Sequence, residues 1–151
     1  MIYSYKQQVS QWPFNPLTRV ITWLKGMDKG NVIGDFGCGE AQIAQAFPDR
    51  MVYSFDLVAG NPLITACNIA KVLMGSDWPM FLLEGTRCLK QGGILKIVEV
   101  KSRFSDINGF DRFIESLGYK KQCDTTPNVG WWKSEYILCR NQTSLFIANL
   151  N

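Results

Sequence analysis

The sequence of 151 residues contains no histidine, and its five cysteines lie far apart without a C-x-x-C pair. Histidine is the usual base beside a nucleophilic serine or cysteine and a common zinc ligand, so its absence argues against both kinds of centre. No apolar run reaches the roughly 18 residues of a membrane-spanning helix, and residues 1–6 lack the features of a signal peptide. We therefore expect a soluble intracellular protein with reduced thiols and no metal.

A strong excess of one charge is also missing. Sixteen Lys and Arg residues against thirteen Asp and Glu give a net charge of +3, which a solvated surface explains without nucleic acid. There is no internal repeat, low-complexity stretch or linker, and 46% hydrophobic residues suffice for a core. We predict a single domain over residues 1–151, with a helical lid over 1–30, an α/β core over 31–140 and a tail over 141–151.

The hydrophobic periodicity predicts alternating strands and helices. Helices are expected over residues 16–25, 40–47, 78–89 and 105–117. Strands are expected over residues 32–36, 51–57, 63–69, 94–100, 119–125 and 134–138, the last two as an antiparallel hairpin. The alternation is typical of an α/β fold with a largely parallel sheet.

A glycine turn joins the first predicted strand to the next helix, with the sequence Asp35-Phe36-Gly37-Cys38-Gly39. Glycines at such a turn let backbone amides approach a ligand closely. Asp56 ends the next strand, where nucleoside-binding α/β folds place a carboxylate for the ribose hydroxyls. Gln42 stands where a dinucleotide motif has its third glycine, which favours S-adenosylmethionine over a nicotinamide cofactor. The alternative, an ordinary strand-to-helix turn, leaves Asp56 unexplained.

Other residues have two interpretations each. Cys38 is expected to be a small neutral filler rather than a nucleophile, since no histidine base is available. Lys101 and Arg103 are either exposed surface or phosphate contacts. The tryptophans are either buried aromatics or stacking surfaces for a base extruded from RNA: Trp12, Trp131 and Trp132. No residue qualifies as a general base, so the catalytic residue is unknown.

Further motifs extend along the chain to about Cys139. They are Gln8-Val9-Ser10-Gln11-Trp12-Pro13-Phe14-Asn15-Pro16, Phe55-Asp56-Leu57, Leu73-Met74-Gly75, Leu89-Lys90-Gln91-Gly92-Gly93 and Glu99-Val100-Lys101-Ser102-Arg103-Phe104. Together with the glycine turn, they resemble the motifs of the ribosomal RNA-processing protein 8, or nucleomethylin, family. The resemblance implies a class I S-adenosylmethionine-dependent methyltransferase with a Rossmann-like sheet and flanking helices. It also implies an adenine of ribosomal RNA as substrate, ribosome biogenesis as the process and the nucleolus of the nucleus as the location.

The resemblance extends the expected cofactor site beyond the glycine turn. The residues assigned to it, by the turn or by the resemblance, are Gly37, Asp56, Asn68, Ile69, Asp35 and Gly39. Asn68 replaces an aspartate of the family; its amide oxygen still accepts a hydrogen bond but carries no charge. A family histidine ahead of Tyr5 is also absent, so we expect an incomplete lid.

One strand of the family pattern is missing. Residues 69–72 run directly into Leu73-Met74-Gly75, where the family has a loop and a whole strand, normally central and beside the first strand. Loss of a central strand leaves backbone groups unpaired. Either residues 64–74 shift to fill the gap, or the sequence is a truncated or mis-spliced product. The alternatives to an active rRNA methyltransferase are a binding module without transfer and a methyltransferase of small molecules or proteins.

Overall fold

The computed structural model describes residues 15–66, 77–90, 92–100, 104–124, 131–138 and 142–149. Its helices are α2 (Pro16–Lys25), α3 (Gln42–Ala46), α4 (Trp78–Cys88) and α5 (Ile107–Ser116). Its strands are β1 (Ile33–Phe36), β2 (Val52–Asp56), β3 (Ile64–Ala66), β4 (Gly92–Val100), β5 (Tyr119–Asp124), β6 (Trp131–Leu138) and β7 (Gln142–Asn149). Most predicted elements are present within a few residues of their expected ends, although α3 is shorter and β6 longer than expected.

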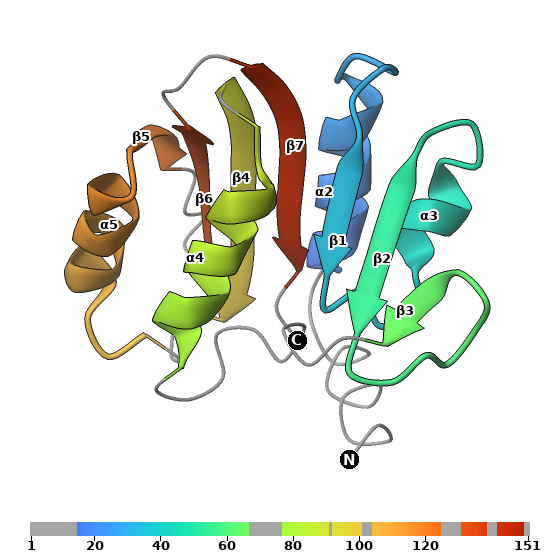
Figure 1. Cartoon of the computed structure of the whole chain (residues 1–151), viewed down its shortest axis with the longest axis horizontal. Helices are drawn as coiled ribbons and strands as arrows, with labels where there is room; N and C mark the ends of the chain where they lie inside the picture. The colour runs from blue at the N-terminus through green and yellow to red at the C-terminus, as the bar shows by residue number, and fades with distance from the viewer. Residues whose placement is uncertain are drawn as a thin grey trace.

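The described strands form one sheet in the order β3-β2-β1-β7-β4-β6-β5 (Figure 1). β3, β2, β1, β7 and β4 run parallel, whereas β6 runs antiparallel to β4 and β5. The predicted α/β class and the closing antiparallel hairpin are confirmed. In such sheets ligands bind at the carboxyl ends of the parallel strands, which here is the edge where β1 leads into the glycine turn.

The centre of the sheet corrects two predictions, namely the tail over residues 141–151 and the absence of a central strand beside the first strand. The segment expected as a tail forms β7, which lies between β1 and β4 and runs parallel to both. It occupies the place beside the first strand that the sequence pattern leaves without a strand. Residues 64–66 form β3 at the edge and do not fill that place, and residues 67–74 lie outside the described residues. The run Leu145-Phe146-Ile147-Ala148 has the continuous apolar character of a central parallel strand.

Helix α2 packs with α3 on one face of the sheet. Its buried residues Val20 and Leu24 belong to the same cluster as Ile33 of β1. The prediction of a lid over residues 1–30 is therefore wrong for α2, because its apolar stripe is buried against the sheet as a core layer. Residues 1–14 lie outside the described residues.

Arg50, in the segment that precedes β2, links this segment to the end of α2 by hydrogen bonds. Its Nη1 donates to the carbonyl oxygen of Leu24 at 2.8 Å and its Nη2 to that of Met27 at 2.9 Å. The guanidinium carbon also lies 4.8 Å from the centre of the Phe47 ring. These bonds add a charged donor to two carbonyl groups at and just beyond the end of α2, where intrahelical donors run out.

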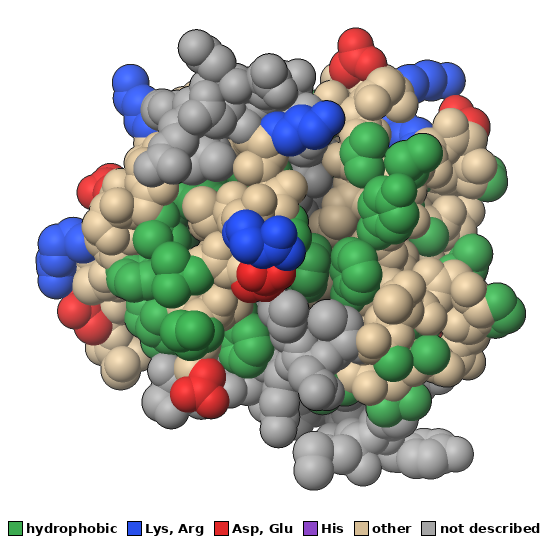
Figure 2. Space-filling view, viewed as in Figure 1, with side chains coloured by type: hydrophobic (Ala, Val, Ile, Leu, Met, Phe, Trp, Pro, Cys, Tyr) green, Lys and Arg blue, Asp and Glu red, His purple; other side chains and the backbone are tan. Residues whose placement is uncertain are grey.

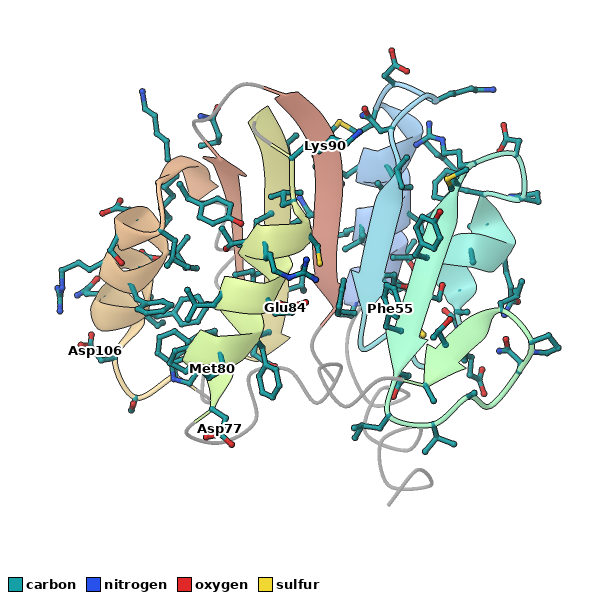
Figure 3. The ribbon with its side chains drawn as sticks, viewed as in Figure 1. Phe55, Asp77, Met80, Glu84, Lys90 and Asp106 are labelled. Atoms are coloured by element: carbon teal, nitrogen blue, oxygen red, sulfur yellow. The ribbon has the colours of Figure 1, made fainter. Side chains whose placement is uncertain are left out.

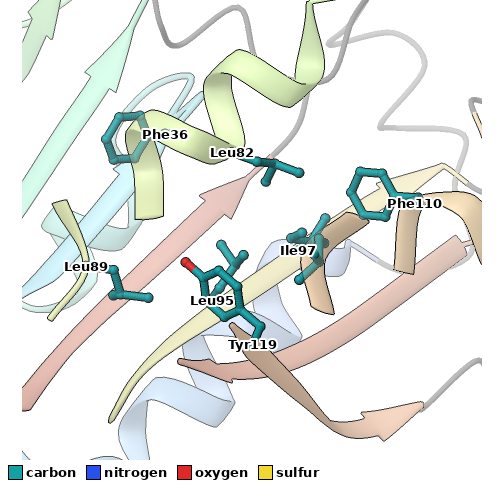
Figure 4. Packing of buried hydrophobic residues seen from close by; sticks show 8 residues of the cluster. Phe36, Leu82, Leu89, Leu95, Ile97, Phe110 and Tyr119 are labelled. Atoms are coloured by element: carbon teal, nitrogen blue, oxygen red, sulfur yellow. The ribbon is translucent and has the colours of Figure 1, made fainter. Parts of the chain in front are cut away.

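Helices α4 and α5 cover the opposite face over β4, β6 and β5 (Figure 1). They bury the larger hydrophobic cluster against β4 and Phe36 of β1 (Figure 4); its members are Phe36, Leu82, Leu89, Leu95, Ile97, Phe110, Ile114 and Tyr119. None of the described helices covers β2 on this face (Figure 1), and Figure 2 shows hydrophobic side chains at the surface of this side. Tyr53 of β2 is 52% exposed. Within the described part of the chain, no helix has the length and apolar character required to cross a membrane.

Candidate functional site

The glycine turn after β1 is anchored to the end of β2 by backbone hydrogen bonds. The N–H groups of Gly37 and Cys38 donate to the carbonyl oxygen of Phe55 at 2.9 and 3.1 Å. Gly37 has φ 76° and Gly39 has φ 58°, a left-handed conformation that costs an L-residue about 1–2 kcal/mol. The two glycines therefore allow the chain to turn sharply at the carboxyl edge of the sheet.

Asp56 holds the turn from the neighbouring strand. Its Oδ2 accepts a hydrogen bond from the N–H of Gly39 at 2.7 Å, and its Oδ1 accepts one from the N–H of Leu57 at 2.7 Å. A carboxylate oxygen has two lone pairs, so each keeps one acceptor position after these bonds. Asp56, which is partly exposed, can therefore hold the turn and accept two ligand hydroxyls at once. The structure brings together the predicted residues Gly37, Gly39 and Asp56.

Asp35 is buried directly before the turn. Its side chain is 1% exposed, and within the described part of the chain neither carboxylate oxygen has a hydrogen-bond partner. Burial raises the pKa of Asp35 to about 7, with a smaller contribution from the negative charge of Asp56. Its register neighbour Ser54 is 2% exposed and also has an unpaired hydroxyl among the described residues. Buried polar groups of this kind are costly unless something pairs with them.

Cys38 lies between the two glycines and is 4% exposed. It packs with Ala41 and Ile64. Burial raises the pKa of the Cys38 thiol to about 12, and the charges of Asp35 and Asp56 add to the effect. A thiol that keeps its proton is a poor nucleophile, which supports the interpretation of Cys38 as a neutral filler.

Asn61 is a site residue that the sequence interpretation missed. Its Nδ2 donates to the carbonyl oxygen of Glu40 at 3.1 Å, and its Oδ1 accepts from the N–H of Leu63 at 2.9 Å. It thus connects the loop after β2 to the loop after β1. The signal was present in the dipeptide Asn61-Pro62, because asparagine before proline favours a turn closed by the side chain.

Two phenylalanines form an apolar wall on the other face of the same strand ends. The ring centres of Phe36 and Phe55 are 4.7 Å apart and the rings are tilted by 32°; Figure 3 shows Phe55 on β2 beside β1. Phe36 follows Asp35 directly, and successive side chains of a strand point to opposite faces. The end of β1 therefore places a carboxylate on one side and an aromatic ring on the other.

Several predicted residues lie outside the described residues, namely Asn68, Ile69, Lys101, Arg103 and Trp12. The backbones of Trp131 and Trp132 begin β6, in register with Val100 and Glu99 at the carboxyl end of β4. Among the described residues, no group of three or more Cys, Asp or Glu side chains is arranged to hold a metal ion.

Comparison with known proteins places the chain among methyltransferases. A family model described as hypothetical methyltransferase matches residues 2–132. Ribosomal RNA-processing protein 8 of Drosophila melanogaster is 43% identical over 76% of this chain and 36% of its own length. The namesake in Dictyostelium discoideum is 38% identical over 97% of this chain and 42% of its own length. A 25S rRNA (adenine(645)-N(1))-methyltransferase of Schizosaccharomyces pombe is 41% identical over 77% of this chain and 45% of its own length.

The chain thus spans less than half the length of these curated relatives. Among solved structures, a candidate methyltransferase from Bacillus halodurans matches 79% of this chain and 95% of its own, with a TM-score of 0.53 and 12% sequence identity. At that identity the similarity concerns the fold, which agrees with the Rossmann-like methyltransferase sheet expected from the motifs.

Proposed function

Since the chain belongs to the methyltransferase family whose model matches residues 2–132, we propose that it binds S-adenosylmethionine at the glycine turn and transfers the methyl group to an adenine of ribosomal RNA. Methyltransferases of this family and fold use S-adenosylmethionine in general. The observation that carries the assignment to this site is the buried carboxylate of Asp35, which has no partner among the described residues.

The chemical groups of S-adenosylmethionine fit the groups of this site. Its amino acid end carries an ammonium, and a cation beside Asp35 would offset both the buried charge and the repulsion from Asp56. Gly37 and Gly39 would lie under that end, where a β-carbon would obstruct the approach. The ribose hydroxyls would donate to the remaining lone pairs of Asp56. By resemblance, Asn68 and Ile69 would flank the adenine.

Bound S-adenosylmethionine supplies a methyl group that is already activated on a sulfonium. The name of the Schizosaccharomyces pombe relative specifies N1 of adenine, a ring nitrogen whose in-plane lone pair can attack without first losing a proton. A chain of 151 residues without histidine is compatible with such an acceptor. The role of the chain is then to hold the methyl donor and the acceptor nitrogen in line, and we assign no catalytic residue.

The RNA substrate, the role in ribosome biogenesis and the nucleolar location rest on the named relatives. Trp131 and Trp132 begin β6 at the edge that would receive the acceptor base, and stacking on an extruded base is their proposed role. Lys101 and Arg103 are proposed phosphate contacts.

A fluorescent fusion that concentrates in the nucleolus would support the location, and uniform cytoplasmic fluorescence would contradict it.

A donor-binding module without transfer is the second candidate. It is favoured by Asn68, which replaces a charged residue of the family at the expected adenine contact. The two candidates share the donor site and differ in whether a methyl group leaves it. Transfer of a labelled methyl group to rRNA supports the enzyme, whereas donor binding without transfer supports the module. Transfer only to a protein or small molecule would instead support a methyltransferase with another acceptor.

The first experiment is calorimetric titration of the purified chain with S-adenosylhomocysteine, the demethylated product. We expect saturable binding that weakens at least tenfold in Asp56→Ala, because the loss of one good hydrogen-bonding carboxylate corresponds to about 1.5–3 kcal/mol. Asp49→Ala removes a carboxylate whose side chain is 59% exposed and pairs with Lys29, so it is the matched control. No binding by a folded protein would sink the proposal.

A further inference from the structure

The strand β7 comes last among the described strands but lies at the centre of the sheet, between β1 and β4 (Figure 1). Resting on the proposed function, we infer that this segment is part of the donor site, so that docking of residues 142–149 and binding of the donor are coupled.

The register of β7 brings its end to the glycine turn. Ile147 pairs with Asp35, and Ala148 pairs with Phe36, the last residue of β1. On the other side, Asn149 pairs with Val98 of β4. Because parallel strands end at the same edge of a sheet, Asn149 is level with the start of the turn.

The short β1 depends on β7 for half of its pairing. β1 has four residues, and each of them has a register partner in β2 and another in β7. Without β7, one side of β1 would become an open edge with unpaired backbone groups. Asp35 would keep its register partner Ser54 in β2 but lose Ile147 in β7, and the turn that begins directly after Phe36 would follow a strand paired on one side only. The donor site is therefore complete only when β7 is docked.

Coupling follows from this dependence. If only the docked form binds the donor, the donor shifts the docking equilibrium of β7 by the same factor by which docking strengthens donor binding. At a donor concentration of about 100 times Kd, the undocked fraction should fall about 100-fold. Amide hydrogens of β7 that exchange through undocking should slow by up to that factor.

Hydrogen–deuterium exchange of the full chain, with and without S-adenosylhomocysteine, tests the inference. We expect peptides covering residues 142–149 to exchange as slowly as those covering Ile33–Phe36 and to slow further, by up to about 100-fold, with the ligand. Exchange of β7 at the rate of an unstructured peptide, beside a protected β1, would overturn the inference. So would ligand protection of β1 that does not extend to β7.

A substitution in β7 gives a second readout. Ile147→Pro removes a backbone N–H from a central strand, whereas Ile147→Val keeps a β-branched residue there. We expect S-adenosylhomocysteine binding to weaken at least tenfold in the proline variant and to stay within about threefold in the valine variant. Unchanged affinity in a folded proline variant would refute the coupling; if that variant does not fold, the exchange experiment on the unmodified chain decides.

The two proposals fail in different ways. If the unmodified chain does not bind S-adenosylhomocysteine, the proposed function fails and the coupling falls with it. If the chain binds the ligand while β7 shows no protection, only the coupling fails and donor binding stands.

Discussion

The buried carboxylate of Asp35 is expected to strengthen donor binding while lowering the free energy of unfolding. In the Asp35→Asn variant an amide of nearly the same shape replaces the titrating group. Because burial raises the pKa of Asp35 from its ordinary value of 3.8 to about 7, the folded protein binds the proton more tightly than the unfolded chain does. Stability should therefore be highest when the group is protonated and should fall as the pH rises through this interval.

The magnitude follows from the two pKa values. A shift of about three units corresponds to about 4 kcal/mol over the whole interval. Between pH 5 and pH 8.5 the contribution is about 3 kcal/mol, or roughly 6–12 °C in Tm for a chain of this size. We expect the unfolding free energy of the unmodified chain to fall by this amount relative to the Asp35→Asn variant.

Urea unfolding of both proteins at pH 5 and pH 8.5 measures this double difference, in which any constant effect of the amide cancels. Asp49→Asn makes the same chemical change at an exposed carboxylate and is the control. S-adenosylhomocysteine should be bound at least tenfold more weakly by the Asp35→Asn variant. A double difference near zero would show that the carboxylate is already paired or hydrated, and the reasoning from burial would be refuted.

Three further predictions concern the framework of the site. Gly39→Ala should weaken S-adenosylhomocysteine binding in titration and lower stability by about 1–2 kcal/mol, since φ at this position is 58°; affinity equal to that of the unmodified chain would contradict this. Asn61→Ala should weaken the same binding severalfold with little change in Tm, because it disconnects two partly exposed loops. Arg50→Ala should lower the unfolding free energy in urea by about 1–3 kcal/mol without affecting donor affinity, and a selective loss of affinity would refute its structural role.

The sequence predicted the parts of the fold that depend on local pattern. Residues 16–25 have helical apolar spacing and form α2, and the glycine turn with Asp56 lies where strand order and spacing place it. The burial of Asp35 was not predicted, because burial depends on tertiary packing that the local sequence pattern does not encode. The role of Asn61 was readable from its turn chemistry but was overlooked.

The central position of residues 142–149 could not be obtained from local pattern. The apolar run Leu145-Phe146-Ile147-Ala148 is short, and such a run is compatible with a strand, a buried helix segment or a loop. The motifs of the family end near Cys139, so the resemblance gave no guidance there either. The strand conformation of residues 142–149 is favoured only by the unpaired side of β1, which is a property of the whole sheet.

The position of β7 also determines the order in which the protein can fold. Ile33 pairs with Leu145, more than a hundred positions later in the chain. During synthesis β1 and β4 emerge before their common neighbour exists, and their facing edges are open until it arrives. Pairing over such a distance is intrinsically slow, so the newly made chain passes through a period when two unpaired strand edges are open to aggregation.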